Sequence, residues 1–433
     1  MLRFLVLPGC VRRSFLYVAT VAKVTLLGMH LALVLAACDD VAEEEFRWEG
    51  EVGQATEADI AGWTPFVEVR IGEYSPHSFL VDTGAPLTHA DTAIYDLDGL
   101  VEGDFDAFGL RFYDRPIVPI ALFGDEEACD GTQRGGLLGG DVLRAFSLAG
   151  DYLSGKLWLF DELAGDVPTE AEVGAAATVP MQVRGGGRFR VGDDDVVDVP
   201  ATRVVVDLDV EGVTVPMLLD TGASYVSISP TLVDLDDGRP TLGEIAIRTA
   251  RGEEQIRVTR LRSVAPGGAA EVASVPAIVL PDDDLLAAIS DEAGVALRGL
   301  LGGSYLREFV FVIDYPAEEL RLARYAEADH IDRREFIGPG FDVEPCGDGF
   351  YVGEIYEDTG VGDDHDIRVG DRVIAIGGET LAGKSTVEVE DLYRGVAPGT
   401  VLAFRLNRWE GDDEDRPDGT EDLEILDLLP DYR

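Results

Sequence analysis

Residues 136–159 read GLLGGDVLRAFSLAGDYLSGKLWL, and residues 299–322 read GLLGGSYLREFVFVIDYPAEELRL. Aligned without gaps, the two stretches agree at 12 of 24 positions. Upstream of each stretch stands the tetrapeptide Asp-Thr-Gly-Ala, at residues 82–85 and 220–223. One such tetrapeptide can arise by chance, but two copies, each followed by the same second motif, indicate an internal duplication. The chain is therefore predicted to contain two related lobes.

The residues before each tetrapeptide alternate in the manner of β-strands. They read FVEVRIGEYSPHSFLV at 66–81 and VVVDLDVEGVTVPMLL at 204–219. The chain also has 50 glycines and 21 prolines, which suit many tight turns. This combination predicts a mainly β fold.

Two aspartates on equivalent loops suggest hydrolysis by a carboxylate pair. When two carboxyl groups lie close enough to share one proton, one of them serves as an acid while its partner serves as a base. Such a pair can activate water for attack on a carbonyl. The small residues after Asp82 and Asp220 suit a tight turn, and the threonines offer hydroxyls that can cross-link two equivalent loops.

Both halves resemble the retropepsin-like fold, the unit that dimerises in retroviral proteases and is duplicated in pepsins. The resemblance covers roughly Trp63 to Tyr325 and implies an aspartic endopeptidase without a cofactor. Asp82 and Asp220 match the catalytic aspartates of that family. The matching active-site loop residues are Thr83, Gly84, Ala85, Thr221, Gly222, Ala223, Ser224, Leu138, Gly139, Leu301 and Gly302.

The two predicted active-site loops are not identical. The residue after Asp-Thr-Gly-Ala is Pro86 in the first half and Ser224 in the second, so the first half lacks a side-chain donor there. Both halves have alanine after the glycine, where pepsins often have serine. That loss of a hydroxyl implies a working pH nearer neutral than that of pepsin.

The second half holds 25 more residues than the first between its two motifs. Much of the excess falls in or near Glu244–Leu261, where two alternating strands flank a tip. We interpret this segment as a single flap over the substrate, with Ala250, Arg251 and Gly252 at its tip. Val101–Pro119 is shorter and offers no counterpart.

From about residue 336 the sequence resembles a PDZ domain, most specifically in Gly370–Gly378, GDRVIAIGG. That family binds an extended peptide beside a strand and holds the peptide's C-terminal carboxylate in a backbone loop. The candidate loop is Ile337–Phe341, with Gly340 and Phe341 as peptide-binding residues. The acidic stretch Asp363–Ile367 is expected to disfavour anionic peptides.

Residues 378–385, GETLAGKS, also fit a nucleotide-binding pattern. We reject this interpretation because only about 50 residues follow, too few for the parallel sheet of such NTPases. The histidines beyond residue 38, which are His77, His89, His330 and His365, lack the spacing of metal ligands. No metal site is therefore predicted.

The first 38 residues are interpreted as a targeting segment. Arg3, Arg12 and Arg13 precede a nearly continuous apolar run that ends in Leu-Ala-Ala-Cys38, which resembles the lipobox of bacterial lipoproteins. Lipidation at Cys38 would anchor the protein to a membrane of the cell envelope, at the periplasmic face or the cell surface. Both Sec and twin-arginine export remain open, as does a disulfide between Cys129 and Cys346.

The formal net charge of −48 argues against nucleic acid as a partner, because phosphate binding needs clustered Lys and Arg. The predicted domains are listed here in chain order: a signal peptide at 1–38, a linker at 39–62, the first lobe at 63–164, the second lobe at 165–328 and a PDZ-like domain at 335–430.

We therefore expect a monomeric, lipid-anchored aspartic endopeptidase that acts on peptides or proteins, with a PDZ-like module that takes a C-terminal peptide. A catalytically silent binding protein is the alternative. Carboxyl groups of Asp82 and Asp220 within hydrogen-bonding reach would favour the enzyme. In a third possibility, each lobe pairs with its equivalent in another chain.

Overall fold

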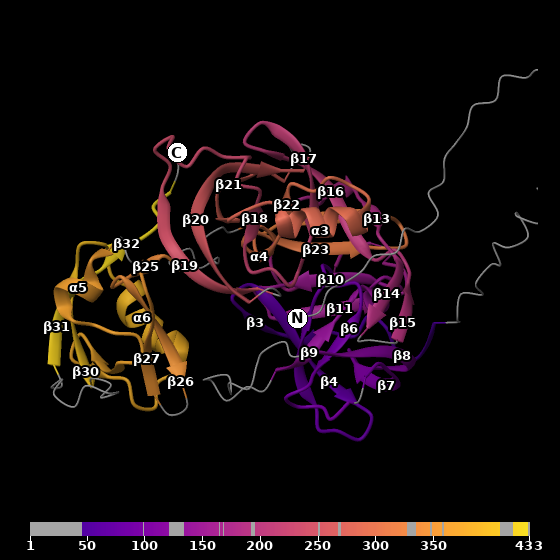
Figure 1. Cartoon of the computed structure of the whole chain (residues 1–433), viewed down its shortest axis with the longest axis horizontal. Coiled ribbons are helices and arrows are strands. Elements are labelled where there is room, and N and C mark those ends of the chain that lie inside the picture. Colours follow the sequence, from indigo (N-terminus) through magenta and orange to yellow (C-terminus); the bar gives the residue numbers. More distant parts are fainter. Residues whose placement is uncertain are drawn as a thin grey trace, which may run out of the picture.

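The chain folds mainly from β-strands into two related lobes and a separate C-terminal domain (Figure 1). The computed structural model describes residues 46–97, 99–120, 134–163, 165–167, 169–191, 195–249, 252–266, 270–326, 335–346, 349–356, 359–407 and 419–431. The predicted signal peptide, Cys38, Cys129 and the predicted flap residues Ala250 and Arg251 lie outside the described residues.

The first lobe is a closed β-barrel. Its ring of strands is listed in chain order: β4 (Thr64–Ile71), β5 (His77–Val81), β6 (Thr88–Asp91), β7 (Val101–Ala107), β8 (Leu110–Ile120) and β9 (Arg134–Leu138). Pairing of β7 with both β4 and β8 closes the ring. The short helix α2 (Gly140–Leu143) follows β9 directly.

The second lobe repeats this barrel. Its ring consists of β16 (Arg203–Val210), β17 (Val213–Leu219), β18 (Val226–Ile228), β20 (Gly252–Ala265), β21 (Val272–Val279) and β22 (Gly299–Leu301). Pairing between β16 and β20 closes it. Helix α3 (Asp284–Ala293) lies between β21 and β22 in the sequence, and α4 (Gly303–Leu306) follows β22. The mainly β fold with two related barrels is thus confirmed.

The strand pairings give the equivalence of the two lobes residue by residue. In the first lobe, β5 runs parallel to β9 and pairs Val81 with Leu138. In the second, β17 runs parallel to β22 and pairs Leu219 with Leu301. Each Asp-Thr-Gly loop therefore leaves its barrel beside the Leu-Leu-Gly motif of its own half.

A six-stranded sheet joins the lobes. Its order is β12 (Ala177–Pro180), β24 (Glu319–Arg324), β23 (Phe309–Asp314), β10 (Ser147–Asp151), β11 (Lys156–Phe160) and β2 (Thr56–Glu57). At its centre Ala149 pairs with Val312, and these two residues occupy the same position of the repeat. A pseudo-twofold axis thus passes between them, and one apolar core continues through both lobes.

Three short strands lie within the segment 39–62 that the sequence predicts to be a linker. Strand β1 (Arg47–Gly50) pairs with β8, β2 with β11, and β3 (Asp59–Ala61) with β4. These strands are short and largely polar, so they lack the alternation that marks a strand in sequence. They extend the edges of sheets whose longer strands supply the apolar core.

The segment between the lobes carries a further hairpin. Strands β14 (Gly187–Val191) and β15 (Asp195–Val199) pair with each other, and β13 (Gln182–Arg184) before them pairs with β16. Val197 and Val199 pack on Leu87 and Val118 of the first lobe. The hairpin thus covers the first lobe although it immediately precedes the second barrel.

The C-terminal domain has its own sheet and its own core. The sheet order is β26 (Phe341–Cys346), β27 (Gly349–Ile355), β28 (Arg372–Ile376), β30 (Val401–Asn407) and β31 (Gly419–Glu424), with β29 (Glu379–Thr380) beside β28. Strands β25 (Ile337–Gly338) and β32 (Leu426–Asp427) form a small second sheet. The domain's helices are α5 (Val361–His365) and α6 (Thr386–Arg394).

Both ends of this domain are fixed to the second lobe. Glu335 forms an ion pair with the buried Arg307, and Arg260 Nε on β20 donates to the Leu429 carbonyl (2.7 Å). Phe336 and Leu429 belong to one apolar cluster with residues of the second barrel. In Figure 1 the β19 (Thr241–Thr249) and β20 hairpin accordingly lies on the side of the second lobe that faces this domain.

Candidate active site

The two Asp-Thr-Gly loops meet between the lobes and are cross-linked by their threonines. Thr83 Oγ1 donates to the Leu219 carbonyl (2.9 Å) and accepts from the Thr221 N–H (3.1 Å). Thr221 Oγ1 donates to the Val81 carbonyl (2.6 Å) and accepts from the Thr83 N–H (3.1 Å). Both threonines are fully buried, so each hydroxyl satisfies backbone groups that water cannot reach.

The Leu-Leu-Gly motif of each half, at residues 137–139 and 300–302, holds the Asp-Thr-Gly loop of the same half from the side. The Asp82 N–H donates to the Leu138 carbonyl (3.0 Å), and the Asp220 N–H donates to the Leu301 carbonyl (3.1 Å). On the far side of the loops, the N–H groups of Gly140 and Gly303 donate to the carbonyls of Ala85 and Ala223, both at 2.8 Å. The structure thus brings together the loop residues predicted from the sequence, in two nearly identical sets.

The two catalytic candidates face each other across the lobe interface. Their carboxyl groups lie within hydrogen-bonding reach of each other. The loops leave no room for a larger residue: a Cβ on Gly84 would stand 2.6 Å from Asp220 Cγ, and one on Gly222 would stand 2.6 Å from Asp82 Cγ. Glycine is therefore required because each loop backbone contacts the opposite carboxyl group.

Burial raises the pKa of both carboxyl groups, because the ionised form is poorly solvated there. The pKa of Asp220 is raised further by the neighbouring charge of Asp82. Asp82 Oδ1 accepts two backbone N–H groups, from Gly84 (2.8 Å) and Ala85 (3.1 Å), whereas Asp220 Oδ1 accepts one, from Gly222 (2.9 Å). The pair is thus placed to share one proton, and the second N–H donor favours Asp82 as its ionised member.

Residues 206–305 match a family model described as aspartyl protease. This range holds the Asp220 loop, the predicted flap and the Leu300-Leu301-Gly302 motif, but less than a quarter of the chain. The internal repeat extends the same motifs to the first lobe. The aspartyl protease match therefore agrees with the carboxylate pair described above.

A solved structure of a retropepsin-like aspartic protease from Rickettsia conorii is also similar to this chain. It is 23% identical, covers 36% of this chain and 94% of its own, and has a TM-score of 0.22. This similarity is too low to extend any property of that protein to this chain. The search of curated proteins found no match.

The predicted flap segment forms a hairpin of the second lobe. Strands β19 and β20 pair from Thr241–Thr259 to Thr249–Gly252, with Gly252 as the first residue of β20. In the first lobe β7 is the equivalent of β20, and the residues described between β6 and β7 form no strand. Among the described residues the hairpin is therefore present in the second lobe and absent from the first, as predicted. Its action as a flap stays a prediction.

Pro86 and Ser224 occupy equivalent places on the two loops. Their carbonyls accept the N–H groups of Asp141 (3.1 Å) and Ser304 (2.8 Å). Because both contacts use the backbone, proline fits the first loop without loss of that bond. The difference between the two residues remains in their side chains.

Sequence reasoning missed several groups near the pair. Tyr152 and Tyr315 stand at one position of the repeat, are buried, and interact electrostatically with the carboxyl groups, which helps to keep their own pKa values raised. Their shared place in the Asp-Tyr dipeptide of both repeats could have identified them. Arg203 has no such signal, because its equivalent in the first lobe is Thr64.

Asp141, in α2, is a buried carboxylate beside the first loop. Its Oδ1 accepts the Thr88 hydroxyl (2.9 Å), and Arg115 Nη2 lies 3.8 Å from its Oδ2. Burial raises the pKa of Asp141 to about 6. The second lobe has Ser304 at this position, whose hydroxyl donates to the Pro276 carbonyl (2.8 Å).

Asp141→Asn should remove a pH-dependent part of the stability. Because the pKa of Asp141 rises on folding, its protonated form stabilises the fold below about pH 4, and that contribution is lost as the pH rises through about 6. The loss is roughly 3 kcal/mol. Urea unfolding at pH 5 and pH 7.5 should therefore show a smaller pH dependence in the variant. An equal change of unfolding free energy between pH 5 and pH 7.5 in the two proteins would contradict this account.

Among the described residues no group of three or more His, Cys, Asp or Glu side chains is arranged to hold a metal ion. None of the described helices is long and apolar enough to cross a membrane. Ser385, the last residue of the rejected nucleotide-binding pattern, begins α6 and exchanges hydrogen bonds with Glu388 in a capping box.

Proposed function

We propose that this protein is an aspartic endopeptidase in which Asp82 and Asp220 activate water between the two lobes. The observation that carries the proposal is the pair of facing carboxyl groups on threonine-locked, twofold-related loops within one chain. The match of residues 206–305 to an aspartyl protease model supports it.

The pair supplies both the base and the acid of the reaction. Ionised Asp82 takes a proton from the water, whose oxygen attacks the carbonyl carbon of the scissile peptide bond, while Asp220 gives its proton to the carbonyl oxygen. The tetrahedral intermediate then breaks its C–N bond as Asp82 passes its proton to the leaving nitrogen. Asp220 recovers a proton from the intermediate's hydroxyl, which restores the starting pair.

A diverse peptide library offered to the full chain, with and without pepstatin, tests this proposal. Cleavage that pepstatin suppresses would support it. An intact library after exposure across pH 4 to 8 would contradict it and would favour the alternative of a catalytically silent binding protein. Pairing between lobes of different chains is not needed for the site, because Thr83 and Thr221 lock it within one chain.

The C-terminal domain is proposed to bind an extended peptide in the manner of a PDZ domain. Strand β26 is an edge of its sheet, and α6 packs beside β26, which leaves a strand edge next to a helix. Such an edge can accept a peptide by strand addition. Gly340 takes a positive φ of 94°, and its carbonyl accepts the Tyr356 N–H (3.0 Å).

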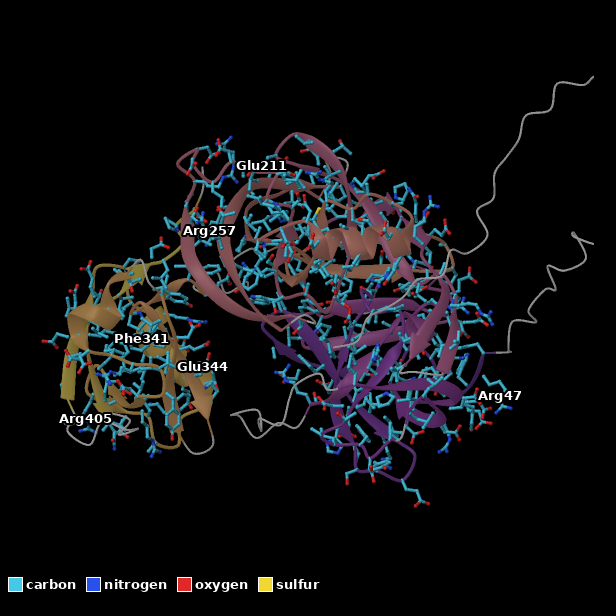
Figure 2. All side chains as sticks on the ribbon, viewed as in Figure 1. Arg47, Glu211, Arg257, Phe341, Glu344 and Arg405 are labelled. Carbon is cyan, nitrogen blue, oxygen red and sulfur yellow. The ribbon has the colours of Figure 1, made fainter. Side chains whose placement is uncertain are left out.

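The side chain of Phe341 belongs to the core of the C-terminal domain. It is 1% exposed and its ring packs on Phe404 inside the domain, 5.7 Å between centroids. Figure 2 accordingly places Phe341 within the C-terminal domain. Only its backbone is available to a peptide.

Binding of a C-terminal peptide can be measured on the full chain with Asp82→Asn, which removes the proposed cleavage. We expect fluorescent peptides with a free apolar C-terminus to bind, and the same peptides to lose roughly tenfold or more in affinity when amidated, because a charged hydrogen bond is removed. Equal binding of both forms would contradict carboxylate recognition.

The envelope location is proposed from the segment that ends at Cys38, which lies outside the described residues. A thioether-linked lipid there would hold the two lobes at a membrane surface through residues 39–46. Metabolic labelling with radioactive palmitate should mark the wild type and not Cys38→Ser. Equal labelling of both would contradict the anchor.

A further inference from the structure

Arg203 breaks the symmetry of the site. It is the first residue of β16 and its side chain is 9% exposed. Its Nη1 donates to the Gly84 carbonyl across the lobe interface (2.5 Å), and its Nη2 forms an ion pair with Glu292 of α3. The equivalent residue, Thr64, donates instead to the nearby Ala61 carbonyl (2.6 Å).

Arg203 acts on Asp82 indirectly, through the backbone of Gly84. The Gly84 N–H donates to Asp82 Oδ1 (2.8 Å) while its carbonyl accepts from Arg203, so both polar groups of this residue are engaged. A guanidinium is planar and permanently charged, so it can fix a carbonyl with one nitrogen and a carboxylate with another. The first loop is thereby held by a charged group that has no equivalent on the second loop.

We propose that Arg203 is a positioning residue for the catalytic pair, which holds the Gly84 backbone against Asp82 and selects Asp82 as the ionised member. This inference rests on the proposed function. It gives a role to the one contact by which a charged side chain of β16 holds the first of two nearly identical loops.

The charge of Arg203 also acts on the pair. It lowers the pKa of both Asp82 and Asp220 against the larger effect of burial. Among the described residues, Tyr152 and Tyr315 also interact electrostatically with the carboxyl groups, and they stay neutral because burial raises their pKa values. Glu292 faces Arg203 and partly offsets its charge.

Substitution of Arg203 and of Glu292 should shift the pH dependence of kcat/KM in opposite directions. The active form carries one proton, so the acid limb of kcat/KM follows the first ionisation of the pair and the basic limb follows the second. Loss of the positive charge in Arg203→Met should move both limbs to higher pH. Loss of the negative charge in Glu292→Gln should move both to lower pH.

The test measures kcat/KM from pH 3 to 9 for the wild type, Arg203→Met, Arg203→Lys and Glu292→Gln, all as full chains. On the acid limb Arg203→Met should be roughly three- to tenfold slower than the wild type, since one pH unit of displacement is tenfold. Arg203→Lys keeps the charge and should restore the position of both limbs. A uniform loss of rate at every pH in Arg203→Met, with unmoved limbs, would overturn the proposal, as would shifts of the same sign in Arg203→Met and Glu292→Gln.

Carbon-13 NMR titration of the aspartate carboxyl groups separates this inference from the proposed function. The signals of the pair are identified by their loss in Asp82→Asn and Asp220→Asn. If the wild type cleaves no peptide, the proposed function fails, yet an upward displacement of both titrations in Arg203→Met would still support the role of Arg203. Unchanged titrations would overturn it.

Discussion

Replacing either Asp82 or Asp220 with asparagine is expected to lower kcat/KM for peptide hydrolysis by at least about 10³-fold, the scale of losing a positioned acid or base. An amide has no proton-accepting carboxylate and no acidic proton at neutral pH. Asp82→Asn removes the base that the Gly84 and Ala85 N–H groups stabilise, and Asp220→Asn removes the acid. The two losses should be far from additive in the double variant, because each leaves the pair unable to cycle its proton.

The same substitutions should leave the fold intact or more stable. Because the pKa of both carboxyl groups is raised on folding, their ionisation works against the fold as the pH rises through those values. An asparagine of similar size removes that cost while it can still accept the Gly84 or Gly222 N–H through its carbonyl oxygen. Urea unfolding at pH 7 should therefore show equal or higher stability in Asp82→Asn and Asp220→Asn.

Asp151→Asn provides the matched control. Asp151 is also a fully buried aspartate at the lobe interface, and its carboxylate accepts the hydroxyls of Tyr325 (2.8 Å) and Thr169 (2.6 Å). It should lose stability and keep its activity per folded molecule, whereas Asp82→Asn should keep stability and lose activity. Turnover near the wild-type rate in Asp82→Asn or Asp220→Asn would refute the proposed mechanism.

The two barrels and the carboxyl pair could be predicted from the sequence because each of their motifs is present in two copies. A motif that recurs in both halves occupies equivalent positions in the two lobes, as Asp82 and Asp220 do. Tyr152 and Tyr315 were available in the same way, since the Asp-Tyr dipeptide recurs at the same place in both repeats.

Features that belong to one half could not be found by this comparison. Arg203 follows no motif, and its contact with Gly84 joins residues 119 positions apart. The short strands β1 to β3 carry too few apolar residues to form a pattern, and they are strands because longer neighbours offer them open edges. Tertiary pairing, not local propensity, determines their conformation.

The threonine cross-link should be the main source of stability specific to the active-site loops. Thr83→Val keeps the shape of the side chain but leaves the Leu219 carbonyl and the Thr221 N–H without their partner inside the protein. Each unsatisfied buried group costs about 1–3 kcal/mol, so the variant should lose about 2–6 kcal/mol of unfolding free energy. Thr221→Val removes the equivalent bonds to the Val81 carbonyl and Thr83 N–H and should lose a similar amount.

Activity should fall with the cross-link even in the folded fraction, because the two carboxyl groups must stay within hydrogen-bonding reach to share a proton. The double variant should lose less stability than the two single variants together, since the first loss already lets the loops separate. Tyr325→Phe is the control: its hydroxyl is also buried and donates to the Asp151 carboxylate (2.8 Å), away from the loops. It should lose stability and keep the kcat of the wild type. A Thr83→Val protein with the stability and kcat of the wild type would show that the loops are held by the second motifs alone.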